Sequence, residues 1–270
     1  MTDVSFGQYY PAKSFVHRLD PRLKFIWLIG YIAAVFSAKD FYALGACAIV
    51  FFLVAAFSGV PIGKLLKSVQ AVAFLLLFTS LLNLFFGQGE TILWQWEFIV
   101  ITQEAVFSTL FFALRLFLLV LGTSILTLTT SPVALTDGIE SLLSPLKWLR
   151  FPVHEFALIM SIALRFIPIL TEETARIMNA QKSRGADFES GGLMQRIKAV
   201  LPIIGPLLIS GFRRAEELGD AMDARCYSGG GTRTKYKKLT FTWRDLVAGL
   251  LLVVLIAAVI VCGLTFPALV

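Results

Sequence analysis

The chain has 270 residues, of which 57% are hydrophobic and only 16% are charged, and its formal net charge is +6. Soluble proteins carry roughly a quarter charged residues, so this composition excludes a soluble globular protein and indicates an integral membrane protein. The two histidines and three cysteines have no metal-ligand spacing, and we therefore expect neither a metal site nor histidine-based catalysis.

The N-terminal segment, residues 1–24, places four basic residues directly before the first apolar run. Positive charge beside a span is typical of the cytoplasmic side, which predicts a cytoplasmic N-terminus. Apolar runs at 25–38 and 41–60 are separated by Lys39-Asp40 and predict two spans joined by a tight outer turn. The first run is shorter than the roughly 20 residues that a span needs.

The chain then returns to the cytoplasmic side at Lys64 and Lys67, and the apolar residues 69–86 predict a third span. Residues 87–104 contain no Lys or Arg but two tryptophans. Tryptophan is enriched at membrane interfaces, so this stretch predicts an outer loop.

The apolar residues 105–130 predict a fourth span, which carries Arg115 near its middle. A charge at that depth costs about 2.5 to 3.5 kcal/mol on insertion scales. We therefore expect Arg115 to face protein and interpret it as an intramembrane structural residue; a role in transport is the alternative.

The last span is predicted at 246–264, and most of the Lys and Arg residues lie between it and the fourth span. This pattern predicts an all-α polytopic membrane protein with five transmembrane helices, the N-terminus inside and the C-terminus outside. The predicted parts are residues 1–130 with four spans, residues 131–244 as a cytoplasmic region of long amphipathic helices, and residues 245–270 with the last span.

Two long helices are predicted in the cytoplasmic region, at 153–183 and 193–224, after a Ser131-Pro132 helix start. The first half of each, at 156–170 and 199–212, is apolar but too short and too rich in Pro and Gly for a span. We expect these halves to lie along the inner leaflet, while the charged second halves reach into the cytosol.

The two long helices end alike, because Ala-x-x-x-Arg occurs at Ala180–Arg184 and again, 41 positions later, at Ala221–Arg225. One interpretation is local capping, since a basic residue followed by Gly favours a helix C-terminus. The other is docking, because a guanidinium at a helix tip offers five donors to carboxylates and carbonyls of a partner. The recurrence favours two equivalent docking points and hence a dimeric or pseudo-dimeric partner.

Four stretches carry a resemblance to a known family: SFVHRLDPRLK at 14–24, SIALRFIP at 161–168, and the two helix ends at 179–187 and 221–227. They are similar to the transmembrane T component of energy-coupling factor transporters, the EcfT/CbiQ family, over nearly the whole chain. The resemblance implies a non-catalytic scaffold whose two tips bind two ABC ATPase subunits, as a homo- or heterodimer. Those subunits would bind ATP and Mg, and this chain would bind no cofactor.

By residue match, the implied ATPase-binding residues are Ser183, Arg184, Gly185, Ala224, Arg225 and Cys226. Cys226 stands where the family usually has Gly, which leaves the backbone shape of the second tip open.

The resemblance also implies a second partner, a membrane protein that binds the substrate and is called the S component. The apolar halves of the long helices would form a platform for it, through Phe156, Met160, Leu164, Ile167, Pro202, Pro206 and Leu208. Packing on the chain's own spans is the alternative. The implied cargo is a vitamin or related micronutrient, the implied location is the plasma membrane of a prokaryote, and we expect contacts with the lipid bilayer and none with nucleic acid.

Two other functions fit parts of the sequence. A conventional ABC permease lines its own substrate path, but it would carry one coupling helix per subunit where this chain has two matched tips. An intramembrane protease of the CAAX-processing kind is suggested by Glu172-Glu173 and Arg176, but two residues intervene instead of three and no histidine follows.

Overall fold

The structure is a computed structural model that describes residues 9–86, 91–96, 99–149, 152–186, 188, 192–227, 229 and 240–265. It divides into two compact units. The bundle unit comprises residues 7–141 and 238–270, and the crossed-helix unit comprises residues 1–6 and 142–237.

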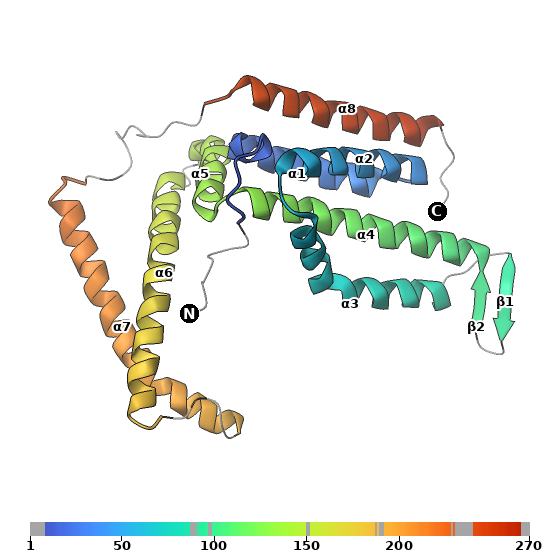
Figure 1. The fold of residues 1–270 in the computed structure, drawn as a ribbon. Coiled ribbons are helices and arrows are strands. Elements are labelled where there is room, and N and C mark those ends of the chain that lie inside the picture. Colours follow the sequence, from blue (N-terminus) through green and yellow to red (C-terminus); the bar gives the residue numbers. More distant parts are fainter. Residues whose placement is uncertain are drawn as a thin grey trace. The chain divides into compact units, whose positions relative to one another are not determined.

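The bundle unit contains the long apolar helices (Figure 1). After the short 3₁₀ turn η1 (Val16–Arg18), they are α1 (Pro21–Ser37), α2 (Phe41–Ser58), α3 (Ile62–Phe86), α4 (Gln103–Thr129) and α8 (Trp243–Thr265).

Four of these helices, α2, α3, α4 and α8, are long and apolar enough to cross a membrane. Helix α1 has 17 residues and is about 26 Å long, slightly less than the roughly 30 Å hydrocarbon core. The expected all-α polytopic membrane protein is thereby confirmed, while the number of crossings and their orientation stay predictions.

Helices α1 and α2 lie between α4 on one side and α8 on the other, and α3 packs along α4 (Figure 1). Small residues bring these helices close together, as is common in membrane bundles. A Cβ placed on Gly122 of α4 would overlap the ring of the fully buried Tyr31 of α1. A Cβ placed on Gly30 would lie 2.9 Å from Leu252 Cδ1 of α8.

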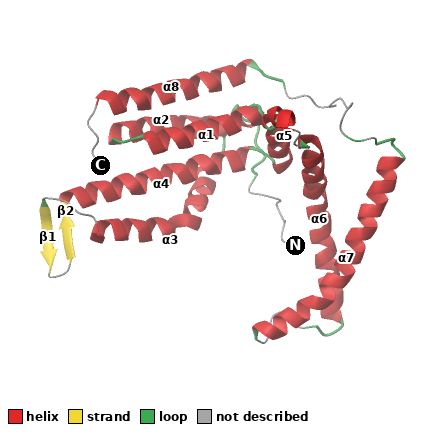
Figure 2. Cartoon of the chain, turned by 180° about the vertical axis from the view of Figure 1, so that it is seen from behind, coloured by secondary structure: helices red, strands yellow, loops and turns green. Residues whose placement is uncertain are grey.

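The stretch between α3 and α4, which the sequence predicts as an outer loop, contains a strand pair that the sequence-based expectation did not include. Strands β1 (Ile92–Trp96) and β2 (Ile99–Thr102) form an antiparallel hairpin (Figure 2). The Ile, Val and Trp residues of this stretch favour extended structure. Its ends are joined by Gln103 N–H, which donates to Thr91 O at 2.9 Å, and by the Thr91 hydroxyl, which donates to Glu104 Oε1 at 2.7 Å.

Helix α5 (Pro132–Leu142) follows α4 and starts as the sequence predicts. Ser131 Oγ accepts the Ala134 N–H at 3.3 Å, as a helix N-cap does. A Cβ placed on Gly138 would lie 3.0 Å from Pro21 Cβ, so α5 lies closely against the start of α1.

The crossed-helix unit consists of a 3₁₀ turn, η2 (Ser144–Leu149), and two helices of 31 residues each, α6 (Val153–Ser183) and α7 (Leu193–Asp223). Helix α6 contains Pro168, and α7 contains Pro202 and Pro206. The two helices cross (Figure 1), so their C-terminal ends point away from the crossing as two separate tips.

Candidate functional site

The first tip is the C-terminal end of α6, which closes through three backbone hydrogen bonds. Arg184 N–H donates to Gln181 O, Gly185 N–H to Lys182 O, and Ala186 N–H again to Gln181 O, each at 3.0 Å. Gly185 has φ +87°, the left-handed conformation that Gly adopts without a steric penalty. Together these features form a Schellman-type helix end.

The second tip, at the end of α7, repeats the first bond for bond. Arg225 N–H donates to Met222 O at 3.1 Å, Cys226 N–H to Asp223 O at 2.9 Å, and Tyr227 N–H to Met222 O at 3.0 Å. Cys226 has φ +54°. The sequence left the backbone shape of the second tip open, and the structure shows the same shape as in the first tip. Cys226 adopts it although it has a Cβ, which Gly185 lacks.

All six residues expected to bind the ATPases are exposed: Ser183, Arg184, Gly185, Ala224, Arg225 and Cys226. The Ser183 hydroxyl donates to Asn179 O at 3.1 Å, which adds a fourth hydrogen bond to the helix end at the first tip. Each arginine follows the last helical turn, where it caps the helix dipole and presents its donors to solvent. Capping and docking are thus compatible at one residue, and the docking role stays a prediction.

Helices α6 and α7 are joined at their crossing by an ion pair, whose carboxylate also pairs with an arginine of its own helix. Glu173 Oε2 lies 3.8 Å from an Arg214 terminal nitrogen of α7 and 3.7 Å from Arg176 on its own helix. Glu173 and Arg214 each lie eleven positions before their tip arginine, or about 16 Å along the helix. The crossing therefore divides α6 and α7 at the same distance from their tips.

The apolar halves of α6 and α7 leave large hydrophobic side chains exposed. Phe156, Met160 and Ile167 of α6 and Leu208 of α7 are between 36% and 56% exposed. Pro202 and Pro206 are also exposed, and Leu164 is half-buried. An apolar surface of this kind is typical of contact with lipid or with a partner, and the expected platform role stays a prediction.

Arg115 of α4 contacts the C-terminal end of α1. Its guanidinium donates to the carbonyl of Ala38, the C-cap residue of α1, and its Cζ lies 4.6 Å from the ring centroid of Phe111. A cation at this place satisfies an unpaired helix carbonyl and favours the dipole. The contact supports the structural interpretation of Arg115.

One carboxylate that the sequence reasoning missed joins two helix starts. Asp245, 2% exposed, accepts the Asp20 N–H at 2.8 Å and the Thr242 N–H at 2.7 Å. Asp20 is the N-cap of α1, and Thr242 directly precedes α8. The N-termini of α1 and α8 therefore lie together, and a single negative charge stabilises both.

Lys24 fixes the end of α4 to the same place. Its ammonium donates to Thr129 O and to Thr130 Oγ1, each at 3.1 Å. The N-terminal segment is tied down nearby by His17, whose ring nitrogens lie 2.7 Å from Ser14 Oγ and 2.8 Å from Tyr10 O. We call Asp20, Lys24 and Asp245 with these partners the polar lock.

The sequence did carry a signal for half of the lock. Ser14, His17, Asp20 and Lys24 recur at three- and four-residue spacing within the 14–24 stretch. The other half was not recognisable, because Thr129 and Asp245 lie 105 and 225 positions from their partners.

Comparisons with known proteins agree with this architecture. A family model described as cobalt transport protein, CbiQ, matches residues 12–236. The chain is 48% identical over 255 residues to the energy-coupling factor transporter transmembrane protein EcfT of Acidaminococcus fermentans, covering 94% of this chain and 95% of the relative. The proteins of the same name from Brevibacillus brevis and Bacillus subtilis are 48% and 44% identical over 264 and 257 residues. They cover 97% and 95% of this chain and 98% and 97% of their own lengths.

The relatives match nearly all of the chain and the family model covers both tips, and together they confirm the resemblance seen in the sequence. The relatives are transmembrane subunits of transporters, which agrees with a non-catalytic transport subunit. The chain therefore belongs to the EcfT/CbiQ family of transporter transmembrane proteins.

Proposed function

We propose that this chain is the transmembrane scaffold and energy-coupling subunit of an energy-coupling factor importer for vitamins or related micronutrients. The observation that carries the proposal is the pair of exposed helix tips with the same hydrogen-bond pattern, each presenting an arginine. Two equal tips fit two equivalent grooves, one on each of two ATPase subunits. Those subunits bind ATP and Mg and carry out hydrolysis, and this chain transmits the motion.

The transmission follows from the geometry of α6 and α7. A partner that moves one tip moves a continuous helix, because α6 and α7 each extend over 31 residues, with Pro168 in α6 and Pro202 and Pro206 in α7. The helices meet at Glu173 and Arg214, so a changed separation of the tips changes the angle at which the helices cross. The apolar halves beyond the crossing then move with it, together with the S component that rests on them.

The orientation of the proposed subunit places both tips in the cytosol of a prokaryotic cell and the bundle in its plasma membrane. The polar lock shows that α1 and α8 start at the same end of the bundle and that α4 finishes there. Basic residues gather in the loops of this end, which favours the cytoplasmic side.

The first experiment purifies the chain from its native membrane and identifies what accompanies it. We expect two ATPase subunits and a separate substrate-binding membrane protein. A homodimer that binds solute without other subunits would instead identify a conventional permease, because such a protein lines its own substrate path.

The second experiment measures ATPase affinity of variants of the tip arginines. Each charge-assisted hydrogen bond contributes about 1.5 to 3 kcal/mol, so Arg184→Ala and Arg225→Ala should each weaken binding by roughly 10- to 100-fold. Arg213→Ala is the matched control, because it removes an exposed arginine of α7 away from the tips. Unchanged affinity and transport in the Arg184→Ala/Arg225→Ala double variant would refute the docking role.

A further inference from the structure

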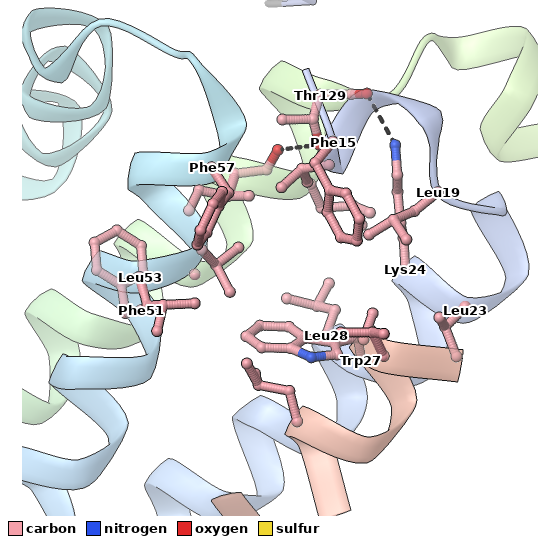
Figure 3. A pocket seen from close by; sticks show the side chains of 18 residues that line it. Phe15, Leu19, Leu23, Lys24, Trp27, Leu28, Phe51, Leu53, Phe57 and Thr129 are labelled. Carbon is pink, nitrogen blue, oxygen red and sulfur yellow. Dashed lines mark hydrogen bonds between the residues drawn. The ribbon is translucent and has the colours of Figure 1, made fainter. Parts of the chain in front are cut away.

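The bundle unit contains an apolar cavity of about 290 Å³ that the proposed function does not use. It lies among η1, α1, α2, α4 and α8 (Figure 3). The polar side-chain groups among the described lining residues are the Lys24 ammonium, the Thr129 hydroxyl and the Trp27 indole N–H (Figure 3), and the first two are already engaged. Lys24 donates to Thr129 O, and the Thr129 hydroxyl donates to Ile125 O at 2.7 Å. The cavity therefore offers a hydrophobic ligand a site and offers water few partners.

The cavity is the open end of the α1–α2 hairpin. The two helices are joined by the short connection at Lys39-Asp40, and the cavity lies at the opposite end, where Leu23 and Trp27 of α1 face Val54 and Phe57 of α2 across it. Protein interiors leave few voids larger than a water molecule. A cavity of about 290 Å³ is large enough to hold part of an apolar ligand.

The cavity has a buried floor and an exposed rim. Phe51 and Ile125, at 2% and 7% exposed, form part of the floor. Phe57 and Val247, at 59% and 42% exposed, form part of the rim. The rim residues belong to α2 and α8, whose mean hydropathies are 2.3 and 3.1. The cavity therefore opens on a surface that suits hydrocarbon, from which an apolar ligand can reach it.

Three basic residues flank lining residues of the cavity in sequence, near the start of α1 and the start of α8. Arg18 and Arg22 directly precede the lining residues Leu19 and Leu23, and Arg244 lies one turn before Val247. Arg22 Nε is buried and has no hydrogen-bond partner among the described residues. The carboxylates of this end, Asp20 and Asp245, already accept backbone N–H groups. These carboxylates keep their two negative charges, and Asp20 Oδ2 is buried without a partner among the described residues. Against them stand Arg18, Arg22, Lys24 and Arg244, so this end is net positive, which suits an anionic headgroup.

We propose that this cavity binds an acyl chain of an anionic phospholipid, whose headgroup phosphate is held by Arg18, Arg22 and Arg244. The acyl chain fills the gap between α1 and α2 and contacts the floor of the cavity. The bound lipid thus completes the packing of the bundle beside the polar lock.

The experiment uses the full chain, assembled with its partners in phosphatidylcholine vesicles that contain a phosphatidylglycerol with a photoactivatable group on one acyl chain. After illumination, mass spectrometry locates the adducts. We expect adducts at Phe51 and Ile125, which bulk lipid does not reach because they are buried. Exposed Phe74, at 81%, reports ordinary contact with the bilayer.

Two variants of α8 test the cavity itself. Ala248→Phe places a ring in the cavity and should lower labelling of Phe51 and Ile125 severalfold, while Ala257→Phe adds the same ring on an exposed part of α8 and should leave it unchanged. Arg18→Gln with Arg22→Gln should lower labelling by phosphatidylglycerol only.

Three results would overturn the proposal. Adducts confined to exposed residues such as Phe74 mean that no acyl chain enters the cavity. Equal labelling of Phe51 by a photoactivatable phosphatidylcholine means that no anionic headgroup is selected. Labelling that is seen with the chain alone in the same vesicles but is lost in the assembled complex assigns the cavity to a protein segment. All three outcomes are measured on the wild-type sequence, so they do not depend on whether a variant folds.

Discussion

Gly185 and Cys226 occupy the same position in two helix ends, 41 residues apart, and both adopt the left-handed conformation. Each donates its backbone N–H to the carbonyl three positions earlier, at 3.0 and 2.9 Å. Their φ angles are +87° and +54°. Left-handed backbone costs a residue with a Cβ about 1 to 2 kcal/mol, so the second tip holds its shape at a cost that the first tip does not have.

Replacing Cys226 by Gly should remove this cost and stabilise the end of α7. We expect the Tyr227 amide, which donates to Met222 O, to exchange its hydrogen roughly 5- to 30-fold more slowly, as about 1 to 2 kcal/mol implies. Cys226→Ala keeps a Cβ and serves as the control. Equal exchange rates in the Gly and Ala variants would show that the second tip is unstrained.

Weakening the ion pair between Glu173 and Arg214 should widen the range of distances between the two tips. Spin labels at the exposed positions Ala180 and Ala221 report their separation, in a chain whose exposed Cys226 is replaced by Ser. Glu173→Gln should broaden the distance distribution without separating the helices, because a partly exposed pair contributes at most about 1 kcal/mol. Glu172→Gln, at an exposed neighbouring position, should leave the distribution unchanged; if it broadens it equally, the pair does not set the crossing.

Close packing of α1 on α4 depends on the absence of a side chain at Gly122. Gly122→Ala should lower the midpoint of thermal unfolding in detergent, because its Cβ would overlap the buried Tyr31 ring and overpacking costs about 1 to 3 kcal/mol. Gly45→Ala in α2 is the matched control, since a Cβ there meets nothing within 4 Å. Similar midpoints for the two variants would contradict this account.

The polar lock should be sensitive to the loss of one acceptor. Asp245→Asn keeps the shape of the side chain but turns an amide NH₂ toward a backbone N–H donor, because both carboxylate oxygens are in use. A buried donor left unsatisfied costs about 1 to 3 kcal/mol, which thermal unfolding measures. Asp223→Asn, at an exposed site on α7, should have almost no effect. A stable Asp245→Asn chain would mean that the lock is dispensable.

Arg115 should tolerate Lys better than Leu. Lysine keeps a cation that can donate to the Ala38 carbonyl, although it loses the planar stacking on Phe111. Leucine leaves that carbonyl without the donor. We expect folded yield in detergent to fall in the order Arg, Lys, Leu, and an equal yield for Lys and Leu would point to packing rather than to the hydrogen bond.

Features with a local cause could be predicted from the sequence. The apolar runs predict α2, α3, α4 and α8 because hydrocarbon demands length and hydrophobicity, and the two tips are visible because capping is local. The hairpin at residues 92–102 was missed because a short strand pair carries little periodic signal. The polar lock was missed because no local pattern connects Asp20 to Asp245, whereas the ion pair of Glu173 and Arg214 required knowledge of where α6 and α7 cross.

The hydrogen bond between Asp20 and Asp245 spans 225 positions of the chain, and this bears on how the protein is made. Ribosomes add about 5 to 20 residues per second, so Asp245 is synthesised on the order of 10 to 50 s after Asp20. Until then the Asp20 N–H at the start of α1 lacks its acceptor, Asp245. Helices α1 to α7 and both tips are translated before this acceptor appears. Helix α8 therefore supplies an acceptor that the start of α1 needs, and a chain truncated before α8 leaves the Asp20 N–H without Asp245.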